Sequence, residues 1–291
     1  MKRLTTTHPD IANDFKRYAQ EHSTAGSHMP GSYVQSINKL NVILKSNTSL
    51  LGQHEDLWTF TDSRRLHGIY EAILAAQKKA DGGFFAGTPT PSYWRQYFYS
   101  SAVKMLMTFL PLRRGREMML VKADEATDAD RLAQELEAIE LPSEQIYWDD
   151  DVPVTSAVGK ERLATIKVRE NQNVFRSMML KNYSSKCCLC GLPIEATLRA
   201  SHISAWAKDV ENRMNPQNGL CLAATYDAAF DRHLISLDED FRLILSSSLR
   251  EYCTNQAFKE QFKAFEGKKI EMPVRFPPSQ RFLAKHREQM A

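Results

Sequence analysis

Hydrophobic residues recur every three or four positions along much of the first 110 residues. This spacing predicts helices that bury one face, because it places the apolar side chains on one side of each helix. It occurs over residues 11–18, 34–44, 66–74 and 93–110. The last stretch is rich in aromatic residues, and we expect its helix to end before Pro111, since proline disrupts a helix interior. We therefore predict an α-helical recognition or regulatory domain over residues 1–110.

The pattern changes after residue 110. Helical spacing returns over 128–139, whereas 141–159 has mixed composition and contains two prolines. The acidic run at 148–151 is more typical of a solvated loop than of a metal site. Residues 111–159 are therefore predicted to form an acidic connector with one short helix.

From residue 160 onward, helical and strand patterns alternate. Residues 162–183 are charged and amphipathic, which predicts a long helix with one apolar face. The short apolar runs 234–237 and 241–245 flank three consecutive acidic residues, and this arrangement predicts a β-hairpin. Residues 160–291 are therefore expected to form a second domain, and the fold class of the chain is α+β.

The charge of the chain is uneven. The net charge of +3 divides into +4 over residues 1–110, −6 over 111–160 and +5 over 161–291. Neither basic block is strong enough to indicate a nucleic-acid partner by itself. No apolar run approaches the roughly 18–20 residues that span a bilayer, so we expect no membrane partner.

All five cysteines lie in the last part of the chain, at Cys187, Cys188, Cys190, Cys221 and Cys253. An odd, clustered set without an apolar leader argues against a disulfide scaffold and favours a reduced, cytoplasmic setting. Cys187 and Cys190 have the spacing of one half of a metal knuckle.

Several short motifs follow the first cysteine in a defined order. They are Cys187-x-x-Cys190-Gly191, "ASHI" with a tryptophan three residues later, "NPQNGLCL" and "YDAAFDRHLIS". Over about residues 160–285 this set resembles the HNH, or ββα-metal, endonuclease family, and in particular its bacterial restriction endonuclease branch. The resemblance implies an N-terminal α-helical domain followed by a C-terminal ββα-metal nuclease domain.

The resemblance gives His202 and Asn218 their expected roles. His202 occupies the position of the general base at the end of the first strand, and a neutral imidazole suits that role at pH 7. The alternative is a hydrogen-bonded structural histidine. Asn218 occupies the position of the asparagine whose amide pins the active-site loop, and it also fits ordinary Asn-Gly turn chemistry.

The expected metal ligands are Asp227 and Asp231. Counted from Asn218, the final histidine of the family falls on Asp227, and carboxylates favour Mg²⁺ or Mn²⁺, one ion per site. Asp231 lies one helical turn later, on the same face, although a cap or a salt bridge is an equal alternative. Ser201 stands where many members carry a metal-binding Asp or His.

The second cysteine pair of the family is missing, because its positions fall on Ala223 and Tyr226. Cys187 and Cys190 therefore resemble a vestigial zinc knuckle, and we expect no structural Zn²⁺. Four further residues are candidates for contact with phosphate or DNA, or else simple surface and turn residues: Ser201, Lys208, Arg232 and His233.

The sequence therefore predicts a metal-dependent DNA endonuclease of a restriction or phage-defence system. Its substrate is expected to be double-stranded DNA, and a homodimer is expected because one such site cuts one strand. Two alternatives remain open: a nuclease effector regulated by a signal that the N-terminal domain senses, and a non-catalytic DNA-binding module with a decayed site.

Overall fold

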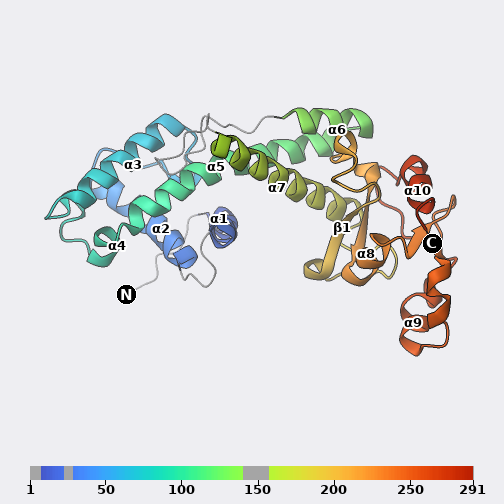
Figure 1. Cartoon of the computed structure of the whole chain (residues 1–291). Helices are drawn as coiled ribbons and strands as arrows, with labels where there is room; N and C mark the ends of the chain where they lie inside the picture. Colours follow the sequence, from blue (N-terminus) through green and yellow to red (C-terminus); the bar gives the residue numbers. More distant parts are fainter. Residues whose placement is uncertain (1–7, 23–28, 140–156, 291) are drawn as a thin grey trace. The chain divides into compact units, whose positions relative to one another are not determined.

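The computed structural model describes residues 8–22, 29–139 and 157–290 (Figure 1). The chain divides into two compact units. One consists of Met1–Gly115 with Leu141–Leu163, and the other of Arg116–Glu140 with Ala164–Ala291. The predicted acidic loop at 148–151, and most of the predicted linker 141–159, lie outside the described residues. None of the helices in the described part of the chain is both long and apolar enough to cross a membrane.

The first unit is built from helices. Its described helices are α1 (Pro9–His22), α2 (Met29–Asn47), α3 (Ser63–Lys78), α4 (Pro91–Arg95) and the first part of α5 (Phe98–Glu125). Asp62 begins α3 by accepting a hydrogen bond from the Arg65 backbone N–H, which satisfies a donor that the helix end leaves free. In the core, the Phe15 ring packs edge-on against Trp58 at 5.4 Å and Phe109 at 5.3 Å.

The predicted helix over 93–110 is wrong at both ends. Tyr97 has a left-handed φ of 58° and separates α4 from α5. At the other end, α5 continues through Pro111 to Glu125. A proline inside a helix costs about 3 kcal/mol, but its neighbours Leu110 and Leu112 are both buried. Burial of side chains of this size stabilises by about 1.5–3 kcal/mol each, which is enough to keep the helix continuous.

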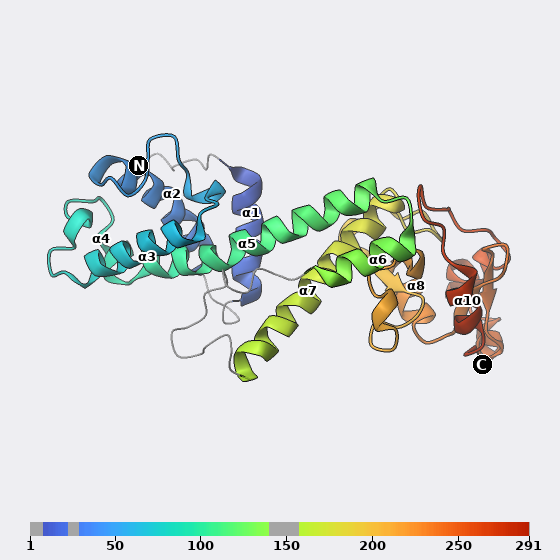
Figure 2. The ribbon, with the colours of Figure 1, turned by 90° about the horizontal axis from the view of Figure 1, so that it is seen from above.

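The second unit combines helices, which Figure 2 shows from above, with two small sheets. Its elements are the end of α5, then α6 (Ala129–Ala138), the greater part of α7 (Ala157–Asn182), β1 (Leu198–His202), β2 (Gly219–Ala223), α8 (Ala224–Phe230), β3 (Ile235–Leu237), β4 (Leu243–Leu245), α9 (Gln256–Gln261) and α10 (Gln280–Arg287). The short helix predicted over 128–139 is confirmed as α6, and the predicted hairpin is confirmed as β3 and β4, which pair antiparallel.

The first sheet of this unit carries the motifs. β1 and β2 are antiparallel, with Ser201 opposite Leu220 and His202 opposite Gly219, and α8 begins directly after β2. Every residue of β2 is buried, so this strand lies in the interior. Two strands followed by a helix therefore bring "ASHI", "NGLCL" and "YDAAFD" into one small region.

Helix α7 supplies the apolar floor beneath this sheet. Val174, Phe175 and Met179 are buried on it, as the amphipathic pattern predicts. Gly219 lets α7 approach closely, because a Cβ at this position would lie 2.6 Å from both Met179 Sδ and Phe175 Cζ. The strand register places His202 beside the same phenyl ring.

Candidate active site

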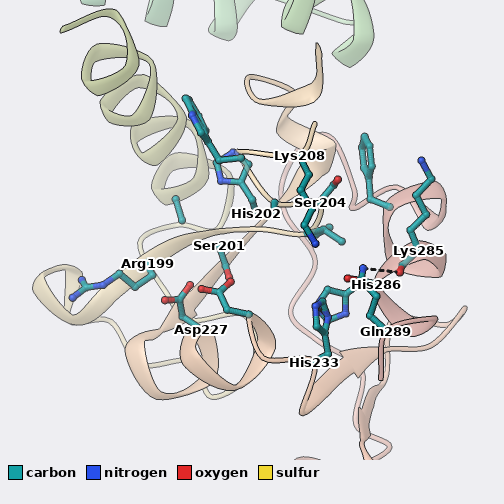
Figure 3. A pocket seen from close by; sticks show the side chains of 16 residues that line it. Arg199, Ser201, His202, Ser204, Lys208, Asp227, His233, Lys285, His286 and Gln289 are labelled. Carbon is teal, nitrogen blue, oxygen red and sulfur yellow. Dashed lines mark hydrogen bonds between the residues drawn. The ribbon is translucent and has the colours of Figure 1, made fainter. Parts of the chain in front are cut away.

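A pocket of about 490 Å³ opens beside β1 (Figure 3). Its walls come from β1 and the loop that follows it, from α8, from the turn before β3 and from α10. The lining includes Ser201, His202, Lys208, Asp227, Asp231 and His233, which are six of the ten residues selected from the sequence. The strand-strand-helix segment and the last helix thus share one pocket.

Ser201, Asp227 and Asp231 form the acidic side of this pocket. Figure 3 shows the Ser201 side chain directed from β1 toward the Asp227 carboxylate on α8. Ser201 is only 2% exposed, and its Oγ has no hydrogen-bond partner in the described part of the chain. Partial burial, and then the negative charge of Asp227, raise the pKa of Asp231 above its usual value. The two carboxylates are therefore close enough to repel each other.

This donor set fits a hard divalent cation. Two carboxylates and an unpartnered buried hydroxyl offer only oxygen atoms, which Mg²⁺ and Mn²⁺ prefer. A cation would also relieve the repulsion between the carboxylates and give the Ser201 Oγ a partner. Among the described residues no group of three or more His, Cys, Asp or Glu could hold a metal, so water and phosphate oxygens would complete the coordination.

The contacts of His202 differ from those of Ser201 and the two carboxylates. Its ring stacks on Phe175 with centroids 3.8 Å apart and meets Trp206 edge-on at 5.2 Å. Figure 3 shows the imidazole on the other side of the β1 ribbon from Ser201 and Asp227, as expected for consecutive residues of a strand. His202 Nε2 lies 2.9 Å from the Arg213 carbonyl oxygen. Since a carbonyl only accepts, Nε2 carries the proton and Nδ1 carries the lone pair.

Burial lowers the pKa of His202 to about 4. The ring is therefore neutral near pH 7, which is the protonation state that a general base needs. The same contacts hold the ring firmly, which is what a structural histidine needs. The structure thus brings Ser201, Asp227 and Asp231 together and places His202 at the pocket with its ring packed against an apolar floor.

Asn218 is fully buried and its amide joins β2 to the loop after β1. Its Oδ1 accepts from the Ser204 backbone N–H at 2.7 Å. Its Nδ2 donates to the carbonyl oxygens of Ser204 at 3.2 Å and Asn212 at 3.1 Å. One side chain therefore fixes two points of the loop that forms the pocket wall.

The other side of the pocket is basic. Lys208 and Lys285 line it, and Figure 3 shows the Lys208 side chain pointing into it. His233 lies at the same wall. Arg232 lies outside the set of described residues that line the pocket, and it donates to the Ala228 carbonyl oxygen at 2.8 Å. This contact gives Arg232 a local role at the end of α8.

The cysteines are free thiols, buried at Cys187, Cys188 and Cys221, half-buried at Cys190 and exposed at Cys253. The Cys188 N–H donates to the Cys221 carbonyl oxygen at 2.8 Å, so the knuckle loop is tied to β2. Burial raises the pKa of Cys188 well above its usual value and that of Cys221 to about 12. Protonated thiols of this kind pack as small hydrophobic side chains.

Three supporting residues were missed from the sequence. Arg176 donates to the carbonyl oxygens of Leu198 and Glu195 and so holds the start of β1. The buried Asn215 accepts from the Gln217 N–H at 2.9 Å, and its position before a proline is a turn signature that could have identified it. His286 on α10 contacts His233, and no feature of the sequence pointed to it.

Residues 187–238 match the family model described as HNH endonuclease. This confirms the resemblance to the HNH family, and the matched segment contains His202, Asn218, Asp227 and Asp231. No curated protein matches the chain.

Proposed function

We propose that this chain, whose residues 187–238 are those of an HNH endonuclease, is a metal-dependent nuclease that hydrolyses phosphodiester bonds in double-stranded DNA. The observation that carries the proposal is the composition of the pocket. The unpartnered Ser201 hydroxyl lies with Asp227 and Asp231 on one side, and Lys208 lies on the other. This arrangement suits a divalent cation beside the two carboxylates and a phosphate anion beside Lys208.

A divalent ion held here would supply positive charge that activates a water and offsets the charge that develops on the attacked phosphate. Asp227 and Asp231 are the residues that would hold it, with Ser201 as a neutral third donor. His202 Nδ1 is the atom that would accept the proton of the attacking water, because Nε2 is committed to the Arg213 carbonyl. Asn218 keeps the loop that carries these contacts in place.

We further propose a restriction or phage-defence role, in which the N-terminal helical residues select the target. A double-strand break needs two cleavage events and each site makes one, so the active form is expected to be a homodimer. Residues 1–110, 111–159 and 160–291 then serve as recognition or regulatory domain, connector and nuclease domain.

Cleavage of methylated and unmethylated plasmid, with Mg²⁺, Mn²⁺ or a chelator, tests the proposal. We expect metal-dependent cleavage that falls about 100-fold or more in Asp227→Asn and Asp231→Asn, since a bound cation contributes several kcal/mol to charge stabilisation. Asp240→Asn, at an exposed hairpin position, is the matched control. Equal rates for all three variants and the wild type would exclude this site.

His202→Ala separates the two functions that remain open. The packed position of its ring favours a second candidate, a DNA-binding module without catalysis. A catalytic His202 predicts that the alanine variant binds DNA normally and cleaves it far more slowly. DNA binding by the wild type without cleavage in any metal would support the non-catalytic module.

A further inference from the structure

A short chain of polar side chains leads from the interior of the second unit to the basic side of the pocket. Ser236 on β3 and His286 on α10 are 0% and 2% exposed. Ser236 Oγ lies 2.9 Å from His286 Nδ1, and His286 Nε2 lies 3.1 Å from His233 Nδ1. His233 then lines the pocket, and Figure 3 shows its ring beside that of His286.

A backbone carbonyl determines where the protons lie in this chain. The Phe230 carbonyl oxygen lies 3.0 Å from His286 Nε2, and it can only accept, so His286 Nε2 carries a proton. That N–H is shared with His233 Nδ1, which must therefore accept. It follows that His233 carries its own proton on Nε2. This conclusion holds whether His286 is neutral or charged, because Nε2 is protonated in both states.

The backbone also holds His233 in place. Its φ of 55° lies in the left-handed region, which costs a non-glycine residue of order 1 kcal/mol. Its N–H donates to the Phe230 carbonyl oxygen at 2.8 Å, in the turn that follows α8. The His286 ring, stacked on Phe230 at 3.9 Å, fills the space behind it. The turn and α10 together therefore fix both the position and the tautomer of His233.

We propose that Ser236 and His286 are positioning residues that set His233 as an Nε2–H donor to a non-bridging oxygen of a phosphodiester in the pocket. The ligand class, a phosphodiester, rests on the proposed nuclease function, whereas the tautomer does not. No acceptor for His233 Nε2 exists among the hydrogen bonds of the described residues, and a phosphate oxygen supplies one. Lys208 lies on the same side and adds the positive charge that an anion requires.

The position of the cation site explains why a donor is useful here. Asp227 and Asp231 are negative and repel a phosphate unless an ion lies between them and the substrate. An N–H at His233, which Figure 3 shows on the side of Lys208, gives the phosphate a second contact beside the cation and fixes its orientation. Because the donor is already present in the neutral imidazole, the contact does not require His233 to be protonated.

The tautomer is tested in the full chain labelled with ¹⁵N-histidine, without metal or DNA. Long-range ¹H–¹⁵N correlation spectra at pH 7.5 distinguish the two tautomers, and His233→Gln assigns the His233 signals. We expect Nε2–H in both His233 and His286. In His286→Phe, which keeps an aromatic ring against Phe230, we expect His233 to become a mixture of tautomers. An Nδ1–H tautomer of His233 in the wild-type protein would overturn the inference.

The phosphate contact is tested by the affinity for a short fluorescent DNA duplex, measured by anisotropy with Ca²⁺, a hard cation that oxygen ligands also bind, and by plasmid cleavage where it occurs. We expect His233→Ala and His286→Phe each to weaken binding or kcat/KM by about 10- to 100-fold, as for one hydrogen bond to a charged group. The double variant should lose little more, because both changes remove one contact. His233→Gln, which retains a side-chain N–H, should recover part of the loss.

These results separate the two proposals. Absence of cleavage in every metal, with weaker DNA binding by His233→Ala, would leave the phosphate contact standing and remove the nuclease function. Normal DNA binding and cleavage by His233→Ala would overturn the phosphate contact and leave the nuclease in place. His54→Phe, at an exposed turn position, is the control for loss of a histidine from this chain.

Discussion

Replacement of Asn218 by alanine is the sharpest test of how the pocket is held together. Asn218 is fully buried between β2 and the loop that follows β1. The substitution removes one acceptor and two donor contacts, to the Ser204 N–H, the Ser204 carbonyl and the Asn212 carbonyl. It leaves the backbone hydrogen bond between the Asn218 carbonyl and the Ile203 N–H untouched.

The size of the effect follows from these contacts. A buried polar group left without a partner costs about 1–3 kcal/mol. Ser204 and Asn212 are only half-buried, so water can reach their freed groups and each loss falls near the lower limit. Three groups then give a loss of about 3 kcal/mol in the free energy of unfolding. The loop should also lose its fixed position before the rest of the unit unfolds.

Hydrogen exchange and urea unfolding measure the two parts of this prediction. The Ser204 amide should lose most of its protection in Asn218→Ala, and cleavage should fall with it. Asn255→Ala is the matched control, because Asn255 caps α9 at an exposed position by accepting from the Phe258 N–H. Asn255→Ala should lower the free energy of unfolding by about 1 kcal/mol and leave cleavage unchanged. Unaltered Ser204 protection in Asn218→Ala, with a stability loss below about 1 kcal/mol, would refute the reasoning.

The close approach of α7 to β2 predicts that Gly219→Ala lowers the free energy of unfolding by about 1–3 kcal/mol through overpacking, since its Cβ would lie 2.6 Å from two side chains. Thermal melts measure this loss. In the same melts Gly68→Ala, inside α3, should be neutral or stabilising, because its Cβ would meet nothing within 4 Å. Burial, together with the charges of His233 and Arg287, lowers the pKa of His286 to about 4, whereas the unfolded value is about 6.5. As the pH falls, the unfolded chain therefore binds a proton at His286 before the folded chain does. The stability that neutral His286 provides is complete above about pH 6.5 and declines toward pH 4. His286→Phe should reduce this decline of the free energy of unfolding with falling pH, measured by urea titrations at several pH values. An unchanged decline would contradict its assignment to His286.

Much of the second unit could be predicted because its pattern is local. The hairpin β3–β4 is marked by two apolar runs around acidic residues, and α6 by its capping Asp128. The i and i+4 spacing also predicts that Asp227 and Asp231 share a face of α8, and both line the pocket. Such features depend on neighbours in the sequence, which a pattern records directly.

The features that escaped prediction depend on distant partners. Helix α5 passes through Pro111 because its flanking leucines are buried, and burial is set by segments far along the chain. The sequence places His202 at the end of a strand, but the ring's contact with Phe175 follows from where α7 packs. His286 lies 53 residues from His233, and in a basic helical tail it has no feature that separates it from a surface histidine.

The two histidines of the pocket illustrate how the backbone can assign chemistry that side-chain identity leaves open. His202 and His233 are chemically the same, and each is neutral or charged according to its surroundings. A carbonyl oxygen at Arg213 fixes the free lone pair of His202 on Nδ1, while the Phe230 carbonyl, acting through His286, fixes the proton of His233 on Nε2. In the proposed site, one ring would accept a proton and the other would donate a hydrogen bond. A reaction that removes a proton from water and places negative charge on phosphate needs one of each, so opposite tautomers at one pocket fit phosphodiester hydrolysis better than two equivalent histidines would.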